Sequence, residues 1–309
     1  LGAYSLSDKE NPMAHTLSPA QFPRHESDAA TPPLFTRIQI QTVSWCNRSC
    51  AFCPSGKFPV PKAFMPLAVY HRIIDQLHDL NFNGRLSPYL MNESLLDKRL
   101  PELIAYARER CPDSWIAINT NGDALSEKLI CRLFDAGLNC MDVNAYDNPA
   151  QYQAYIALAE RATAQRPDIT CSTGYLDPTF HSYHLPRHTK ILHCRDMTDW
   201  EARFRDQLEI SDLINRAGNV PDAPRLTEPL ALGCERPFQQ MYINYLGEAV
   251  LCCNDWRFEV VMGDTAKSSL LDIWSNDKYR AYREQLQRRN RNMTLCASCD
   301  YRGQPRLAE

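Results

Sequence analysis

Short apolar strands alternate with amphipathic helices from residue 36 to about residue 210, and this alternation limits the possible folds more than any other feature of the sequence. The segment TRIQIQTV (36–43) has the two-residue period of a strand, and PLAVYHRIIDQLHDL (66–80) has the apolar spacing of a helix. Repeated β–α units favour a parallel sheet and allow a curved, barrel-like one. Further strands are predicted at 84–90, 115–120, 140–146, 168–175 and 189–194, and further helices after residue 101 and over 125–138, 148–166 and 199–208.

Composition and charge exclude several classes of protein. The chain has 309 residues, of which 44% are hydrophobic, and a formal net charge of −3. A nucleic-acid binder that relies on bulk charge would be basic, and a membrane helix would need an apolar run of about 18 residues, which the sequence lacks. Residues 1–34 are polar and show no charged-then-apolar leader pattern, so we expect a tail that buries little surface. These features predict a cytoplasmic protein without nucleic-acid or membrane partners.

The sequence pattern changes after about residue 215. The segment MYINYLGEAVLCC (241–253) is typical of a hairpin that turns near Leu246 and Gly247, and residues 269–289 have the spacing of one amphipathic helix. We therefore predict a boundary near 215–225, with one domain over 35–215 and a smaller one over 216–309.

Thirteen cysteines in a cytoplasmic chain indicate metal binding or redox chemistry, because disulfides are disfavoured in that compartment. Three of them, Cys46, Cys50 and Cys53, directly follow the first predicted strand with the spacing Cys-x3-Cys-x2-Cys. Three thiolates on a 4Fe–4S cube leave its fourth iron open to a substrate or cofactor. The alternative is a zinc site that a distant residue completes.

Polar side chains mark the ends of the next three predicted strands. Because the carboxyl ends of parallel strands meet at one edge of a sheet, we expect these side chains and the three cysteines to form one site. Taken alone, each asparagine is also typical of a strand-to-helix turn or a helix cap. The residues are Asn92, Glu93, Asn119, Asn121 and Asn144.

The first cysteine motif resembles the signature of the radical S-adenosylmethionine superfamily, Cys-x3-Cys-x-aromatic-Cys, and Cys46, Cys50, Phe52 and Cys53 match it position by position. The resemblance implies a partial (β/α)6 TIM-like barrel. It also implies that the open iron binds S-adenosylmethionine, whose reductive cleavage gives a 5′-deoxyadenosyl radical that takes a hydrogen atom from the substrate.

The same resemblance implies roles for the polar strand ends. Asn92 and Glu93, in YLMNE, stand where the superfamily usually has Gly-Gly-Glu, and they are expected to hold the ammonium of S-adenosylmethionine. The two glycines are absent here. Asn119, Asn121 and Asn144 match strand ends that bind the cofactor's ribose and carboxylate, and Phe52 is expected to contact it too.

A second cysteine set resembles the SPASM/twitch extension of these enzymes. Its spacing is Cys-x12-Gly-x4-Cys, a long gap, and Cys-x2-Cys, and no cysteine follows the last pair. The resemblance implies a small α+β domain with one auxiliary 4Fe–4S cluster whose four ligands all come from the protein. The alternative is a structural zinc. The predicted ligands are Cys234, Cys252, Cys296 and Cys299, with Cys252 preferred to Cys253 because it fits the glycine spacing.

The resemblance predicts a radical S-adenosylmethionine oxidoreductase or epimerase with two 4Fe–4S clusters, reduced by a partner such as flavodoxin or ferredoxin. The cysteine spacing and the form CAFCPSG favour enzymes acting on aminocyclitols and sugars in antibiotic biosynthesis, and hence a small polar substrate. The alternatives are a modifier of ribosomally made peptides and a non-catalytic zinc-binding interaction protein.

Two thiols are candidate hydrogen donors if the reaction is an epimerisation, namely Cys194 and Cys253. Dehydrogenation is favoured over epimerisation because the auxiliary cysteine set is clear. The loop over 175–196 contains His181, His184 and His188, and we expect it to cover the substrate opening.

Overall fold

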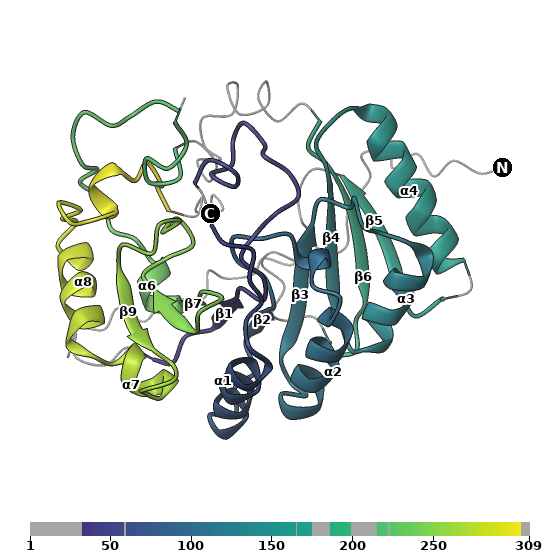
Figure 1. Ribbon diagram of the computed structural model, residues 1–309, viewed down its shortest axis with the longest axis horizontal. Coiled ribbons are helices and arrows are strands. Elements are labelled where there is room, and N and C mark those ends of the chain that lie inside the picture. The colour runs from purple at the N-terminus through teal and green to yellow at the C-terminus, as the bar shows by residue number, and fades with distance from the viewer. Residues whose placement is uncertain are drawn as a thin grey trace, which may run out of the picture.

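The computed structural model describes residues 33–58, 60–164, 166–174, 186–198, 215–221 and 223–303. Its main feature is one nine-stranded sheet in the order β5-β6-β4-β3-β2-β1-β7-β8-β9 (Figure 1). In this order, each strand from β5 to β7 pairs in parallel with the next. Strand β8 pairs antiparallel with β7, and β9 pairs antiparallel with β8. The sheet is open, with β5 and β9 at its edges. The predicted α/β class and the partial, unclosed barrel are therefore confirmed.

Strands and helices alternate along the parallel part as the sequence predicts. Two helices begin with a side-chain cap, Ser126 before α3 and Asn148 before α4. The helix predicted over 199–208 and the histidines His181 and His184 lie outside the described residues. The strands are β1 (Arg37–Ile40), β2 (Arg85–Ser87), β3 (Trp115–Thr120), β4 (Cys140–Ala145), β5 (Thr170–Gly174) and β6 (Ile191–Asp196), and the helices are α1 (Leu67–Asp79), η1 (Ser94–Leu96), α2 (Leu100–Arg110), α3 (Glu127–Asp135) and α4 (Pro149–Thr163).

The order of the last two parallel strands differs from the chain order, because β6 lies between β4 and β5. The side chains explain this difference. Strand β6 begins with the buried run ILHC, which suits a strand with neighbours on both sides, whereas β5 reads TCSTG and is largely exposed. A polar strand is less costly at an edge than in the middle of a sheet.

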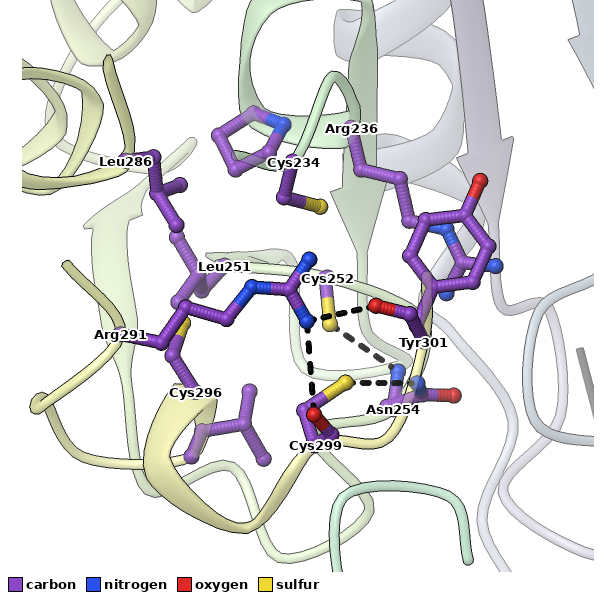
Figure 2. A pocket seen from close by; sticks show the side chains of 12 residues that line it. Cys234, Arg236, Leu251, Cys252, Asn254, Leu286, Arg291, Cys296, Cys299 and Tyr301 are labelled. Carbon is purple, nitrogen blue, oxygen red and sulfur yellow. Dashed lines mark hydrogen bonds between the residues drawn. The ribbon is translucent and has the colours of Figure 1, made fainter. Parts of the chain in front are cut away.

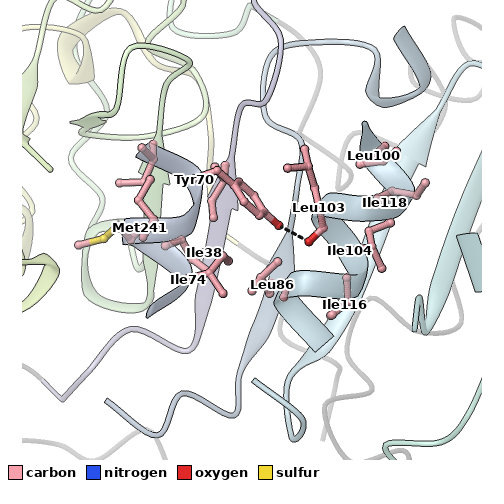
Figure 3. Packing of buried hydrophobic residues seen from close by; sticks show 14 of the residues in the cluster. Ile38, Tyr70, Ile74, Leu86, Leu100, Leu103, Ile104, Ile116, Ile118 and Met241 are labelled. Carbon is pink, nitrogen blue, oxygen red and sulfur yellow. Dashed lines mark hydrogen bonds between the residues drawn. The ribbon is translucent and has the colours of Figure 1, made fainter. Parts of the chain in front are cut away.

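The apolar core lies between the sheet and its helices. Figure 3 shows α1 and α2 packing against β1 to β3, with Ile74, Ile104 and Ile118 among the fully buried side chains. Tyr70 of α1 donates a hydrogen bond of 3.1 Å to the Leu103 carbonyl of α2, which joins the two helices across the core.

The other face of the sheet changes character along the strands. Near the amino ends it carries a small apolar group of four buried residues, Trp115, Ala117, Cys140 and Ile191. Strand side chains alternate between faces, so the same face then presents Asn119, Asp142, Asn144, His193 and Arg195 toward the carboxyl ends. We call the first group of residues the apolar floor of this face and the second group its polar rim.

The C-terminal part continues the same sheet. Strand β7 (Gln240–Ile243) pairs in parallel with β1 and leads through a hairpin to β8 (Glu248–Val250) and β9 (Val261–Asp264). The predicted hairpin over 241–253 is confirmed. Gly247 at its turn has φ +86°, and a Cβ there would lie 2.8 Å from Val69 of α1.

The predicted single helix over 269–289 is wrong, because the structure has two helices there. Helix α7 (Leu270–Trp274) ends before Ser275, and α8 (Asp277–Gln287) begins with Asn276 as a side-chain cap that accepts from the Tyr279 amide. The other C-terminal helices are the short α6 (Arg236–Gln239) and η3 (Cys296–Ser298). No helix in the described ranges has both the length and the apolar character that crossing a membrane requires.

Candidate functional site

The three-cysteine loop (residues 46–53) leaves the carboxyl end of β1, and all three of its thiols are half-buried. The Cys46 sulfur accepts hydrogen bonds from the Arg48 amide at 3.4 Å and from Asn121 Nδ2 at 3.7 Å. The Cys53 sulfur accepts from the Ser55 amide at 3.5 Å. Donors of this kind stabilise thiolate ligands, so the loop is suited to hold a metal group.

Arg48, between the first two cysteines, ties the loop to the ends of two strands. Its guanidinium binds Asp123, after β3, through two hydrogen bonds of 2.7 and 2.5 Å, and Asp147, after β4, through two of 2.7 and 3.0 Å. Asn47 adds a bond of 2.6 Å to Asp123. We call these four residues the Arg48 network. Sequence reasoning missed it, because the two partners are 75 and 99 residues away.

Glu93 lies at the centre of the predicted cofactor residues and is 5% exposed. Its carboxylate accepts hydrogen bonds from the Thr120 hydroxyl at 2.6 Å, the Asn121 amide at 2.7 Å and the Leu95 amide at 3.0 Å. Its own amide donates to the Trp45 carbonyl, next to Cys46. Burial raises the pKa of Glu93, and the three hydrogen bonds oppose that rise. Glu93 therefore joins the ends of β2 and β3 to the three-cysteine loop.

The remaining predicted cofactor residues lie at neighbouring strand ends. Phe52 contacts the Tyr146 ring, with centroids 5.2 Å apart, and Asn144 Nδ2 donates to the Thr120 carbonyl at 3.1 Å. Asn92 Nδ2 and Asn119 Oδ1 are buried and have no hydrogen-bond partner among the residues that the structure describes. Buried polar atoms are rarely left unpaired in proteins. A polar cofactor with ammonium, carboxylate and hydroxyl groups fits this site, because it would supply their missing partners.

The second cysteine set forms a pocket in the C-terminal part, which we call the four-cysteine pocket (Cys234, Cys252, Cys296 and Cys299). All four thiols line the same cavity, together with Arg236 and Arg291 (Figure 2). Asn254 donates from its amide to the Cys252 sulfur at 3.3 Å and from Nδ2 to the Cys299 sulfur at 3.9 Å.

Cys252, and not Cys253, lines this pocket. The Cys253 sulfur instead accepts from Arg236 Nη1 at 3.3 Å. Cys194, the other proposed hydrogen donor, belongs to the core on the helix-covered face of β6, whereas His193 and Arg195 face the polar rim. The geometry thus favours Cys252 as the ligand and gives Cys194 no path to that rim.

The thiols of both sites need a cationic centre to become ligands. Burial raises the pKa of Cys46 to about 11 and those of Cys234 and Cys296 to about 12. Among the residues that the structure describes, no three His, Cys, Asp or Glu side chains are arranged to hold a single metal ion.

Family models match the two stretches of the chain that carry the two cysteine sets. Residues 40–172 match the model of the radical S-adenosylmethionine superfamily, and residues 234–300 match the SPASM model, described as an iron–sulfur cluster-binding domain. The chain therefore contains a radical S-adenosylmethionine domain and a SPASM domain. Its cofactors are accordingly S-adenosylmethionine and iron–sulfur clusters, so these two predictions are confirmed. The individual ligand and cofactor residues stay predictions.

This radical S-adenosylmethionine enzyme is similar over most of its length to characterised proteins. The S-adenosyl-L-methionine-dependent 2-deoxy-scyllo-inosamine dehydrogenase of Niallia circulans is 27% identical over 272 residues, which are 86% of this chain and 93% of the relative. The crystal structure of BtrN in complex with AdoMet and 2-DOIA matches with a TM-score of 0.66 and 26% identity, covering 88% of this chain and 95% of that one. BtrN in an open conformation matches with a TM-score of 0.59 and 24% identity, over 87% of this chain and 94% of that one, and supports the fold.

Proposed function

We propose that this enzyme oxidises a carbinol carbon of an aminocyclitol-like metabolite to a ketone. The observation that carries the proposal is the similarity to an inosamine dehydrogenase over 93% of that relative's length. An inosamine is a carbocycle with several hydroxyls and one amine, which agrees with the predicted small polar substrate.

The first site binds and orients the cofactor in this proposal. Cys46, Cys50 and Cys53 would hold one 4Fe–4S cluster, and Glu93 would accept from the ammonium of S-adenosylmethionine. Asn92 was predicted to hold the same ammonium, but its unpaired atom is the donor Nδ2, which suits an acceptor such as the cofactor's carboxylate. When bound, these groups supply a carbon radical that removes a hydrogen atom from the substrate. The chain's own part is to fix the loop at the strand ends through Asn121 and the Arg48 network.

The polar rim of the sheet is the proposed substrate surface. The register places Asp142 beside His193 and Asn144 beside Arg195, all on the face above the apolar floor. Carboxylate, imidazole, amide and guanidinium groups together provide donors and acceptors for hydroxyls and an acceptor for an ammonium.

The four-cysteine pocket provides the second half of the oxidation. Converting a carbinol to a ketone removes one hydrogen atom from carbon, one proton from oxygen and one electron. Because all four ligands of the second cluster come from protein, that cluster suits an electron acceptor better than a substrate-binding one. An epimerase would instead return a hydrogen atom to the carbon and needs no such acceptor.

The test is turnover of 2-deoxy-scyllo-inosamine by anaerobically purified enzyme with S-adenosylmethionine and a reduced flavodoxin or ferredoxin. We expect a product two hydrogens lighter, and a deuterium label at the carbinol carbon should appear in 5′-deoxyadenosine. The same reaction in deuterated water separates the alternative. An epimer that carries solvent deuterium at that carbon, with no ketone formed, would contradict dehydrogenation. If Cys253→Ser no longer formed this deuterated epimer, Cys253 would be identified as the donor thiol.

A further inference from the structure

The four-cysteine pocket contains a buried positive charge that no carboxylate balances. Arg291 is 2% exposed and lines the pocket. It donates to four backbone carbonyls and forms no ion pair with a carboxylate in the part of the chain that the structure describes. The four carbonyls belong to Leu232, Gly233, Cys299 and Tyr301, at distances from 2.6 to 3.3 Å.

Removing a guanidinium from water is costly unless an opposite charge or a ring face compensates it. The neighbouring Arg283, equally buried, has such compensation, because its guanidinium lies 4.1 Å from the Trp274 ring and 4.5 Å from the Tyr279 ring. In the described part of the chain, no aromatic ring lies over the Arg291 guanidinium. In Figure 2 its guanidinium points toward the space that the cysteine sulfurs enclose.

A second arginine borders the same space. Arg236 is 8% exposed and lines the pocket, with its guanidinium 3.7 Å from the Tyr301 ring and Nη1 3.3 Å from the Cys253 sulfur. The pocket therefore combines four cysteines with two cations. A 4Fe–4S cube with four thiolate ligands is an anion in its common oxidation states, so it would provide an opposite charge for Arg291, with Arg236 as a second cation nearby.

We propose that Arg291 and Arg236 balance the negative charge of the auxiliary cluster and thereby raise its reduction potential. This rests on the proposed assignment of the four cysteines to that cluster. Adding one electron makes the cluster more negative, so nearby cations stabilise the reduced form more than the oxidised form. The effect is strong here because both cations are withdrawn from solvent.

The three-cysteine loop lacks this arrangement. Its arginine, Arg48, already binds two carboxylates, Asp123 and Asp147, so its charge is compensated within the chain. The two clusters would therefore differ in their electrostatic surroundings. The difference favours an electron residing on the auxiliary cluster, which is what the proposed oxidation requires.

The experiment measures the midpoint potentials of both clusters by electron paramagnetic resonance during titration with dithionite, in the full-length reconstituted enzyme. The variants are Arg291→Gln, Arg291→Lys, Arg236→Gln and Arg236→Lys, and Arg283→Gln is the control for loss of a buried arginine away from the cysteines. We expect the glutamine variants to shift the auxiliary potential to more negative values and to leave the first cluster unchanged. The lysine variants should keep most of the wild-type value, and Arg283→Gln should shift neither potential.

The possible outcomes distinguish an electrostatic role of the two arginines from a purely structural one. An unchanged auxiliary potential in fully iron-loaded Arg236→Gln and Arg291→Gln would overturn the inference, and so would an equal shift in Arg283→Gln. If the glutamine variants lose the auxiliary cluster, its retention in the lysine variants supports the counter-charge role, whereas loss in both types shows that hydrogen-bond geometry alone matters. Wild-type enzyme with only one cluster would instead contradict the proposed function itself.

Discussion

Glu93 illustrates how far a single residue can be understood from sequence. Its place in MNE, after a strand, predicts a cofactor contact only through resemblance to a family motif. The structure adds that its carboxylate already accepts three hydrogen bonds from the chain. An ionised carboxylate has about four acceptor positions, so roughly one remains for an ammonium. Glu93 thus has a structural role that no local pattern reveals, because two of its three partners, Thr120 and Asn121, are 27 and 28 residues away.

Changing Glu93 to Gln removes the negative charge that we expect to face the cofactor's ammonium. Loss of such a buried partner costs about 2 kcal/mol or more, which is roughly a 30-fold rise in the Kd of S-adenosylmethionine. Isothermal titration measures this directly. Thr120→Val is the matched control, because it removes one hydrogen bond to Glu93 and keeps the charge. Equal weakening in both variants would show that Glu93 acts by holding strand ends together.

Cys50 is a suitable residue for testing the first site, because its sulfur makes no hydrogen bond to any other described residue, unlike those of Cys46 and Cys53. In Cys50→Ala, the iron content should fall from about eight to about four per chain, and 5′-deoxyadenosine formation should stop. Iron analysis and product chromatography measure the two effects. Cys131→Ala, a half-buried thiol of α3, is the control and should change neither. Cofactor cleavage at the wild-type rate in Cys50→Ala would refute the assignment.

At the scale of elements, periodicity and caps predict most strands and helices, but they do not predict which strands lie next to each other in the sheet. The two-residue period of 36–43 and the caps at Ser126 and Asn148 are local, and the corresponding elements form. Placing β6 between β4 and β5 depends on comparing the burial of two strands, which a local pattern does not supply. The division of 269–289 into α7 and α8 could have been predicted, because Ser275 and Asn276 interrupt the helix with a cap signal.

The Arg48 network gives a prediction about the whole loop. In Arg48→Gln the loop loses its ion pairs with Asp123 and Asp147, and only the weaker bonds of Asn47 and Asn121 still join it to the end of β3. Its amides should therefore exchange faster with deuterated water even without iron. The stability change is on the order of 1 kcal/mol, because the ion pairs are partly exposed. Hydrogen exchange with mass spectrometry measures the loop.

Arg132→Gln, which breaks an exposed pair with Glu102, is the control for loss of a surface arginine. It should leave exchange of the three-cysteine loop unchanged. If Arg48→Gln exchanges like the wild type and takes up iron at the same rate, the network does not preorganise the loop.

Across the whole molecule, β1 links the two cysteine sites. Its carboxyl end leads into the three-cysteine loop, and its backbone pairs in parallel with β7, whose hairpin leads to Cys252. The spacing of each cysteine set could be read from the sequence, but this shared sheet could not, because about 200 residues separate the paired strands. The division into domains at 35–215 and 216–309 stays a prediction, since the sheet runs through both parts.

Removing one ligand of the four-cysteine pocket tests whether the two sites cooperate. In Cys299→Ala the iron content should fall by about half, while the first cluster stays in place and still cleaves S-adenosylmethionine. Ketone formation should fall much further than cleavage, because the electron leaving the substrate then lacks its proposed acceptor. The ratio of 5′-deoxyadenosine to ketone should therefore rise from near one, measured by chromatography of the same reaction. Cys171→Ala, an exposed thiol of β5, is the control and should keep that ratio. If cleavage and ketone formation fall in equal proportion in Cys299→Ala, the second site only stabilises the fold, and the electron must leave the substrate by another route.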